Sequence, residues 1–166
     1  MLQPVVRRTW APKGDTPIQY SWDRRDRLSA ISAVTVSPQR RRLGLYFALH
    51  DHNIRTPEVE AFAADLLRHL PHGFTLVLDR SQPHRSAARR LEQRFPRRVR
   101  IEWLPPYAPD LNPDEQVWAR TKHGDLANFI PEDITDLRRA VEHSLLRTRT
   151  QQAMMRSFFK HAELKL

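Results

Sequence analysis

The pattern of apolar positions in the first half of the chain predicts three strands and leaves room for a fourth. Residues 28–36 (LSAISAVTV) end in β-branched side chains, and residues 42–50 (RLGLYFALH) follow after a Ser-Pro-Gln-Arg turn. These two segments predict a strand hairpin. Residues 74–78 (FTLVL) are apolar on both faces, which is typical of a buried parallel strand, and Asp79 follows them directly. Residues 18–22 fit a short additional strand.

Helical spacing of apolar residues begins after the predicted hairpin. Residues 56–70 start with Thr-Pro-Glu, a helix-initiating sequence, and then place apolar side chains three and four positions apart. A second helix is predicted at about residues 84–95, with small and apolar residues on one face and arginines on the other. The other predicted elements are a strand at residues 99–104, a rigid loop at 105–113, a helix capped by Asn112-Pro113 that continues to Lys122, and helices at about 131–147 and 150–161.

The order hairpin, helix, strand, helix, strand, helix predicts an α/β protein. A right-handed crossover places the strand that ends at Asp79 beside the strand that ends near Leu104, so their carboxyl ends lie together. Asp79 and Glu115 therefore converge on one sheet edge, and we expect their carboxylates to lie within about 10 Å of each other. Paired carboxylates on a basic protein suit a divalent-metal site that acts on phosphates. The alternative is that both acids are ordinary capping and helix-dipole features.

Composition narrows the class of protein. A chain of 166 residues with 40% hydrophobic and 28% charged residues is consistent with one folded domain. The absence of cysteine excludes disulfides, thiolate zinc sites and thiol nucleophiles. No apolar run approaches the roughly 20 residues that a bilayer requires, so we expect a soluble, cytoplasmic protein without membrane association. Phosphate-cradling glycine motifs and the serine-hydrolase Gly-x-Ser-x-Gly pattern are also missing.

The charge points to a polyanionic partner. The sequence carries 28 Lys+Arg against 19 Asp+Glu, a formal net charge of +9, and 24 of the basic residues are arginine. Such a surface attracts phosphate backbones by counterion release. The arginine bias has a second explanation in a GC-rich coding sequence. The tripeptide His50-Asp51-His52 resembles a metal-binding pattern, but without further ligands at suitable spacing it is interpreted as a polar strand end.

Two motifs carry a family resemblance. The strings LVLDRSQPHRS at residues 76–86 and LPPYAPDLNPDEQVWARTK at residues 104–122 closely resemble the catalytic core of mariner-like bacterial insertion-sequence transposases, which belong to the DDE superfamily of endonucleases. The similarity extends upstream through RRTWAPKGDTP at residues 7–17 and covers nearly the whole chain. It implies a ribonuclease-H-like mixed sheet flanked by helices, as a single catalytic domain over residues 1–166 without the helix-turn-helix domain that recognises transposon ends.

The resemblance also implies a mechanism and its residues. In this family three acids bind two Mg²⁺ or Mn²⁺ ions, which cleave a DNA strand and then drive attack of the freed 3′ hydroxyl on a target. Asp79 matches the second acid, and Glu115 matches the third, 36 positions later. Asp114 is a rival, but neighbouring helical residues point about 100° apart, so the two cannot face one ion equally. His84 is expected either to orient the site or contact a phosphate, or to be a helix-start histidine bonded to backbone.

Two departures from the family pattern bear on activity. Arg80 replaces the usual Asn after the strand Asp, which puts a cation beside the metal position. The first family acid lies on the central strand, which would precede Met1, so we expect this chain to lack that strand and to be inactive alone. The remaining acids in this part of the chain do not close an apolar strand as Asp79 does; they are Asp15, Asp23, Asp26 and Asp51. The alternative function is a non-catalytic DNA-binding remnant or a regulator of full-length transposase.

The expected partner is DNA, both transposon ends and target, together with a second copy or a full-length transposase, in the bacterial cytoplasm at the nucleoid. The residues predicted to contact DNA are Arg85, Arg89, Arg90 and Lys122. The longer basic run that continues through Arg94, Arg97, Arg98 and Arg100 fits a DNA track and a solvated helix face equally well. The aromatic residues Trp103, Tyr107 and Trp118 are expected to pack in the protein rather than stack on bases.

Overall fold

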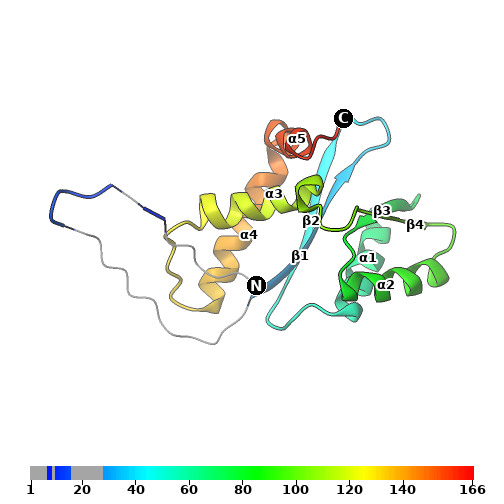
Figure 1. Ribbon diagram of the computed structural model, residues 1–166. Helices are drawn as coiled ribbons and strands as arrows, with labels where there is room; N and C mark the ends of the chain where they lie inside the picture. The colour runs from blue at the N-terminus through cyan, green and yellow to red at the C-terminus, as the bar shows by residue number, and fades with distance from the viewer. Residues whose placement is uncertain (1–6, 9, 16–27) are drawn as a thin grey trace.

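The part of the chain that the structure describes folds into two small sheets flanked by helices (Figure 1). The computed structural model describes residues 7, 8, 10–15 and 28–166, so the predicted strand at residues 18–22 lies outside the described residues. The elements in chain order are β1 (Ser29–Val36), β2 (Leu43–His50), α1 (Thr56–His69), β3 (Phe74–Leu78), α2 (Gln82–Arg94), β4 (Val99–Trp103), a 3-10 turn (Pro109–Leu111), α3 (Pro113–Arg120), a π-helical segment (Thr121–Asp125), α4 (Ile134–Thr150) and α5 (Gln152–His161).

The predicted hairpin is confirmed. β1 and β2 pair antiparallel, with Ser29 opposite His50 and Val36 opposite Leu43. The turn between them closes through two backbone hydrogen bonds, from Ser37 N–H to the Arg42 carbonyl at 2.9 Å and from Arg40 N–H to the Ser37 carbonyl at 2.7 Å. β-Branched residues at the end of β1 and the proline-containing turn thus produce the hairpin that their local preferences indicate.

The parallel pair of strands is confirmed as well. β3 and β4 are joined through α2 and pair in parallel, so Leu78 and Trp103 lie at the same edge and Asp79 follows directly. The prediction that β3 is buried on both faces is wrong, because the Val77 side chain is 55% exposed. Helices α1 and α2 cover only one face of this pair, the face to which Leu76 and Leu78 point.

The four described strands form two separate sheets. Within the described residues, β1 pairs only with β2 and β3 pairs only with β4, so the parallel and antiparallel pairs of the expected mixed sheet are both present but not joined by hydrogen bonds. In Figure 1 the β1–β2 hairpin lies between the α1–β3–α2–β4 group on one side and α3, α4 and α5 on the other. The α/β class with flanking helices is confirmed.

Two hydrophobic clusters hold these layers together. The larger one joins the hairpin to α3, α4 and α5 through fully buried side chains, among them Leu45, Val117, Leu145 and Met155. The smaller one joins α1 and α2 to the parallel strands, and its buried members are Val59, Ala63, Leu67, Ala87, Leu91 and Val99. Ile31 of β1 packs against this second cluster, so the hairpin is shared by both. The apolar spacing that predicted α1 and α2 identifies the faces that they bury.

Helix boundaries differ from the predictions by a few residues, for local reasons. α1 begins after Arg55, whose backbone N–H is capped by the Glu58 carboxylate at 2.7 Å. α4 begins at Ile134, because the Asp133 side chain accepts a hydrogen bond from Asp136 N–H at 2.7 Å and so forms the N-cap. α3 ends at Arg120 and continues as the π-helical segment. None of the helices in the described residues is long and apolar enough to cross a membrane.

Candidate metal and nucleic-acid site

Asp79 directly follows β3, and its side chain is hydrogen-bonded to residues at the start of α2. Its Oδ1 accepts a hydrogen bond from Ser81 N–H at 2.9 Å and lies 2.5 Å from Nδ1 of His84. The Asp79 side chain is about half exposed at 52%, whereas that of His84 is 26% exposed. Of the two alternatives for His84, the structure places the ring against the Asp79 carboxylate. The Ser81 side chain hydrogen-bonds to the Asp79 carboxyl group as well.

The surroundings of Asp79 favour its ionised form. Partial burial raises the pKa of this carboxyl, but hydrogen bonds from Ser81 and the hydrogen bond and charge of His84 outweigh that effect, so the pKa lies below its ordinary value. The carboxylate is therefore charged at neutral pH. A charged, half-exposed oxygen ligand at the carboxyl end of a strand fits a hard divalent cation.

Asp114 and Glu115, the two rivals for the next acid, have different surroundings. The Ser32 hydroxyl lies 2.8 and 2.7 Å from the two oxygens of Asp114, and Trp118 Nε1 donates to Oδ2 at 3.1 Å. Burial raises the pKa of Asp114 to about 6. Glu115, the next residue, is exposed. Asp114 is thus used in packing α3 against β1, which leaves Glu115 as the accessible acid of this turn.

The start of α3 is fixed by the predicted cap. The Asn112 side chain accepts a hydrogen bond from Asp114 N–H at 3.1 Å, so the prediction that Asn112 caps the helix is confirmed. At the other end, the π-helical segment is held by Asp125, which pairs with Arg120 at 3.1 Å and with Arg147 of α4 and accepts a hydrogen bond from Ser144 at 2.8 Å. This network was not predicted, since its members are far apart in sequence.

The described residues do not bring three metal-ligating side chains together. No group of three or more His, Cys, Asp or Glu suited to a metal ion occurs among residues 7, 8, 10–15 and 28–166. Asp15 lies in an exposed turn, and Asp51 bonds to His52 at 2.9 Å. Asp23 and Asp26 lie outside the described residues. No group of three ligating side chains therefore includes Asp79 or Glu115 within the described residues.

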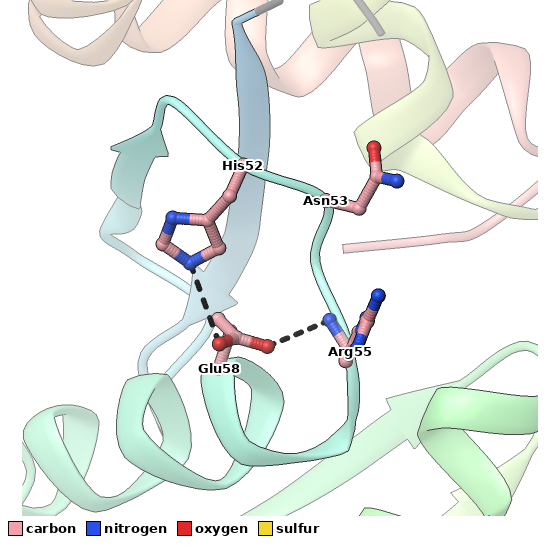
Figure 2. A pocket seen from close by; sticks show the side chains of 4 residues that line it. All are labelled: His52, Asn53, Arg55 and Glu58. Atoms are coloured by element: carbon pink, nitrogen blue, oxygen red, sulfur yellow. Dashed lines mark hydrogen bonds and ion pairs between the residues drawn. The ribbon is translucent and has the colours of Figure 1, made fainter.

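A polar pocket of about 480 Å³ lies where β2 leads into α1, lined by His52, Asn53, Arg55 and Glu58 (Figure 2). Glu58 sits between two donors: it accepts from the Arg55 backbone N–H and faces Nε2 of His52 at 3.4 Å. Hydrogen bonding to Asp51, and more weakly to Glu58, raises the pKa of His52. The polar groups of Asp51, His52 and Glu58 therefore bind one another. We interpret these contacts as stabilising the connection between β2 and α1.

The basic run after residue 84 divides into two groups. Several of its arginines are bound within the protein: Arg90 pairs with Glu60 at 3.0 Å, Arg98 donates to the Leu67 carbonyl at 2.8 Å, Arg100 pairs with Glu102 at 3.0 Å, and Arg94 lies 5.1 Å from the Phe95 ring centroid. Arg85, which donates to Gln82 Oε1 at 3.1 Å, and Arg89 are exposed and line a pocket. Lys122 is partly buried in the π-helical segment.

That pocket, of about 370 Å³, lies between α2 and the end of β4 and was not predicted. Its lining residues are Arg80, Arg85, Ala88, Arg89, Glu92 and Trp103. Arg80 donates from Nε to the Leu104 carbonyl at 3.2 Å, so its guanidinium is directed toward the end of β4. The i, i+4 spacing of Arg85 and Arg89 was a signal in the sequence that they share a helix face.

The three aromatic residues expected to pack behave differently. Trp118 packs against the larger hydrophobic cluster, as predicted. For Tyr107 the prediction is wrong: its side chain is fully exposed at 102%, and its backbone has a positive φ of 56° in the loop before α3. Trp103 is partly buried and belongs to neither hydrophobic cluster. The three aromatic residues differ in burial because of the loop geometry at Tyr107 and the tertiary packing around Trp103 and Trp118.

Comparisons with known proteins agree with this fold. The chain is similar to two solved structures of the Mos1 mariner transposase. The paired-end complex with Mn matches with a TM-score of 0.61 at 13% identity, and the strand-transfer complex with a TM-score of 0.63 at 14% identity. Each match covers 98% of this chain and 48% of that chain, so the chain spans about half the length of these structures. They show the same fold. No curated protein sequence matches significantly.

The family model described as "DDE superfamily endonuclease" matches residues 1–138, which is most of the chain. The matched range includes the end of β3, α2, β4 and the whole of α3, and therefore both acids singled out above. The chain belongs to the DDE superfamily endonuclease family.

Proposed function

We propose that this chain is the catalytic-core portion of a DNA transposase, which cleaves DNA strands and transfers them during transposition of an insertion sequence. The observation that carries the proposal is the ionised Asp79 carboxylate at the carboxyl end of β3, fastened to His84, in a chain of the DDE endonuclease family. The net charge of +9 supports a DNA substrate. The proposed domain is a single one over residues 1–166.

Each proposed site residue has a distinct task. Asp79 and Glu115 would supply carboxylate oxygens to divalent cations, and His84 positions Asp79 through its contact with Oδ1. Two Mg²⁺ or Mn²⁺ ions, when bound, activate the attacking oxygen and stabilise the leaving one. Arg85, Arg89, Arg90 and Lys122 contact DNA phosphates, with Arg90 shared with Glu60.

A third carboxylate is needed to complete this site. The described residues contain no three-ligand group, and β1 and β3 each have one hydrogen-bonded neighbour there. A strand that pairs with both β1 and β3 and ends in an acid would place its carboxylate beside Asp79, because parallel strands end at the same edge. We propose that such a segment lies outside the described residues, and that the 166-residue chain by itself does not cleave DNA.

A nicking assay tests both the site and its completion. Supercoiled DNA is incubated with Mg²⁺ or Mn²⁺ and with the 166-residue chain, a product extended by its upstream coding sequence, or extended Asp79→Asn and Glu115→Gln variants. Cleavage is expected only with the extended product, and both substitutions should abolish it because each removes a metal ligand. Extended Glu102→Gln, an exposed acid on β4, serves as the matched control and should remain active.

Two outcomes of this assay would contradict the proposal. Cleavage by the 166-residue chain that disappears in Asp79→Asn would show that the third acid is already present, and Asp15, Asp23, Asp26 and Asp51 would then be replaced in turn. Undiminished cleavage by extended Glu115→Gln would exclude Glu115 as a ligand.

The absence of a three-ligand group among the described residues also favours a second candidate, a non-catalytic DNA-binding protein that regulates a full-length transposase through mixed oligomers. Both candidates place the protein on DNA, at the bacterial nucleoid, with transposon ends or target as the ligand. The DNA sequence upstream of codon 1 separates them. A coding stretch for an apolar strand ending in Asp supports the catalytic core, and its absence supports the regulator.

A further inference from the structure

The pocket between α2 and the end of β4 combines cations with an aromatic ring. Its lining contains three arginines (Arg80, Arg85 and Arg89), one carboxylate (Glu92) and the indole of Trp103. We propose that this pocket binds one unpaired nucleotide of a DNA strand, with the arginines on its phosphate and the base stacked on the Trp103 indole. The proposal rests on the proposed function, because it takes DNA as the substrate.

The charges of the lining select an anion. Three guanidinium groups against one carboxylate leave an excess of positive charge around a space of about 370 Å³. A guanidinium can grip phosphate with two parallel N–H groups. Arg80 is held in place by its Nε bond to the Leu104 carbonyl, and Arg85 by its bond to Gln82, so both are oriented before a ligand arrives. Preorganised donors lose less entropy when they bind.

Trp103 supplies the second part of the recognition. Trp118 packs against the larger hydrophobic cluster and donates its indole N–H to Asp114. Trp103 belongs to neither cluster and instead borders the arginines. An indole face beside phosphate-binding arginines is the combination on which single-stranded nucleic acids stack their bases.

The position of the pocket fixes which nucleotide it would hold. Arg80 directly follows Asp79 and Arg85 directly follows His84, so the pocket adjoins the proposed catalytic carboxylate. A base stacked on Trp103 cannot remain stacked in a duplex at the same time. The pocket should therefore favour single-stranded over duplex DNA and hold a nucleotide close to the strand that is cut.

Fluorescence anisotropy with labelled oligonucleotides tests this, in EDTA so that metal chemistry plays no part. Trp103→Leu should weaken binding of a single strand about tenfold and change duplex binding by less than about twofold, because only the unpaired base uses the indole. Trp103→Phe should restore most of the lost affinity. Arg85→Gln should weaken single-strand binding more than the control Arg97→Gln, which removes an exposed charge outside the pocket. Thermal unfolding confirms that each variant is folded.

Three results would overturn the proposal. Equal losses of single-strand and duplex affinity in Trp103→Leu would show that the pocket binds DNA only through its charge and does not stack a base. Equal binding of a normal single strand and one with abasic positions would exclude base stacking. Binding of free deoxyadenosine monophosphate, without binding of single strands, would show a free-nucleotide site instead. None of these results depends on cleavage. Failure of the nicking assay would therefore count against the proposed function without deciding whether the pocket binds a nucleotide.

Discussion

Ser32 and Asp114, 82 positions apart in sequence, are joined by the Ser32 hydroxyl, which lies 2.8 Å from Oδ1 and 2.7 Å from Oδ2 of the carboxyl group. This bond fastens the first turn of α3 to β1. Because Glu115 is the next residue of the helix, its direction is set by the same bond, about 100° around the helix axis. A partly buried polar contact thus orients the acid proposed to bind metal.

The ionisation of Asp114 should make stability depend on pH. Its folded pKa of about 6 lies above the ordinary value of 3.8, so the carboxyl stabilises the fold when protonated and this contribution is lost as pH rises from about 4 to above 6. Asp114→Asn keeps the shape without the charge. As pH rises between these limits, the free energy of unfolding of Asp114→Asn should increase relative to that of the wild type, by at most about 3 kcal/mol.

Urea unfolding in EDTA at about pH 4 and about pH 7.5 measures this difference. Asp110→Asn, an exposed acid in the preceding turn, is the control and should show little change in the difference between the two pH values. A difference between wild type and Asp114→Asn that is the same at both pH values would contradict the raised pKa.

His52 should titrate above its ordinary pKa of 6.5. Hydrogen bonding to Asp51 is the largest cause and Glu58 adds to it, so the charged ring stabilises the fold below the ordinary pKa and this effect disappears as pH rises through the raised pKa. An NMR titration of the ring should show a larger fall in the His52 pKa in Asp51→Asn than in Glu58→Gln. Glu60→Gln is the control. A wild-type ring that titrates at or below 6.5 would exclude this charge arrangement.

Gly73 should be intolerant of any side chain. Its φ is 82°, and a Cβ atom there would lie 2.2 Å from the Arg98 carbonyl oxygen, which is backbone and cannot move aside easily. We expect Gly73→Ala to lower the free energy of unfolding by about 2 kcal/mol or more. Gly124→Ala meets its nearest atoms at 3.5 Å and should be nearly neutral. Equal midpoints for the two variants in chemical denaturation would show that the α1–β3 turn relaxes.

Gln152 should contribute to stability as a clamp on the start of β2. Its amide accepts from Leu43 N–H at 3.0 Å and donates to the Leu43 carbonyl at 2.9 Å, so one side chain satisfies both polar groups of a buried residue. Gln152→Ala leaves both unpaired and should cost about 1–3 kcal/mol in thermal or urea unfolding. The same substitution at exposed Gln93 of α2 should stay within about 0.5 kcal/mol. Similar effects at both positions would mean that water replaces the clamp.

Duplex DNA binding should weaken steeply with salt and show little sequence preference, because the net charge of +9 acts on the phosphate backbone. Titrations at several salt concentrations give the slope of log affinity against log salt. Replacing one phosphate-contacting cation, as in Lys122→Gln, should reduce the magnitude of this slope by about one, whereas Lys165→Gln near the chain end should leave it almost unchanged. A flat salt response would exclude the basic face as a DNA track.

The sequence by itself determined the features that depend on neighbouring residues. Periodic apolar positions specified α1 and α2, because an amphipathic helix has only one face to bury. Runs of β-branched and apolar residues indicated the hairpin and the parallel pair of strands. The Asn112 cap was predictable since its hydrogen bond spans two residues. The motifs around Asp79 and Glu115 identified the family, which the family model confirms.

Tertiary structure alone decided which of several chemically similar residues pack in the protein and which remain accessible. Asp114 and Glu115 are adjacent acids, yet only the contact with Ser32 assigns Asp114 to packing. Trp118 packs against the larger hydrophobic cluster, whereas Trp103 belongs to neither cluster and lines the pocket. One face of β3 is exposed because helices cover only the other face. The apolar pattern of residues 74–78 did not reveal this. Each of these outcomes depends on contacts between distant segments, and hydrophobic periodicity carries no information about such partners.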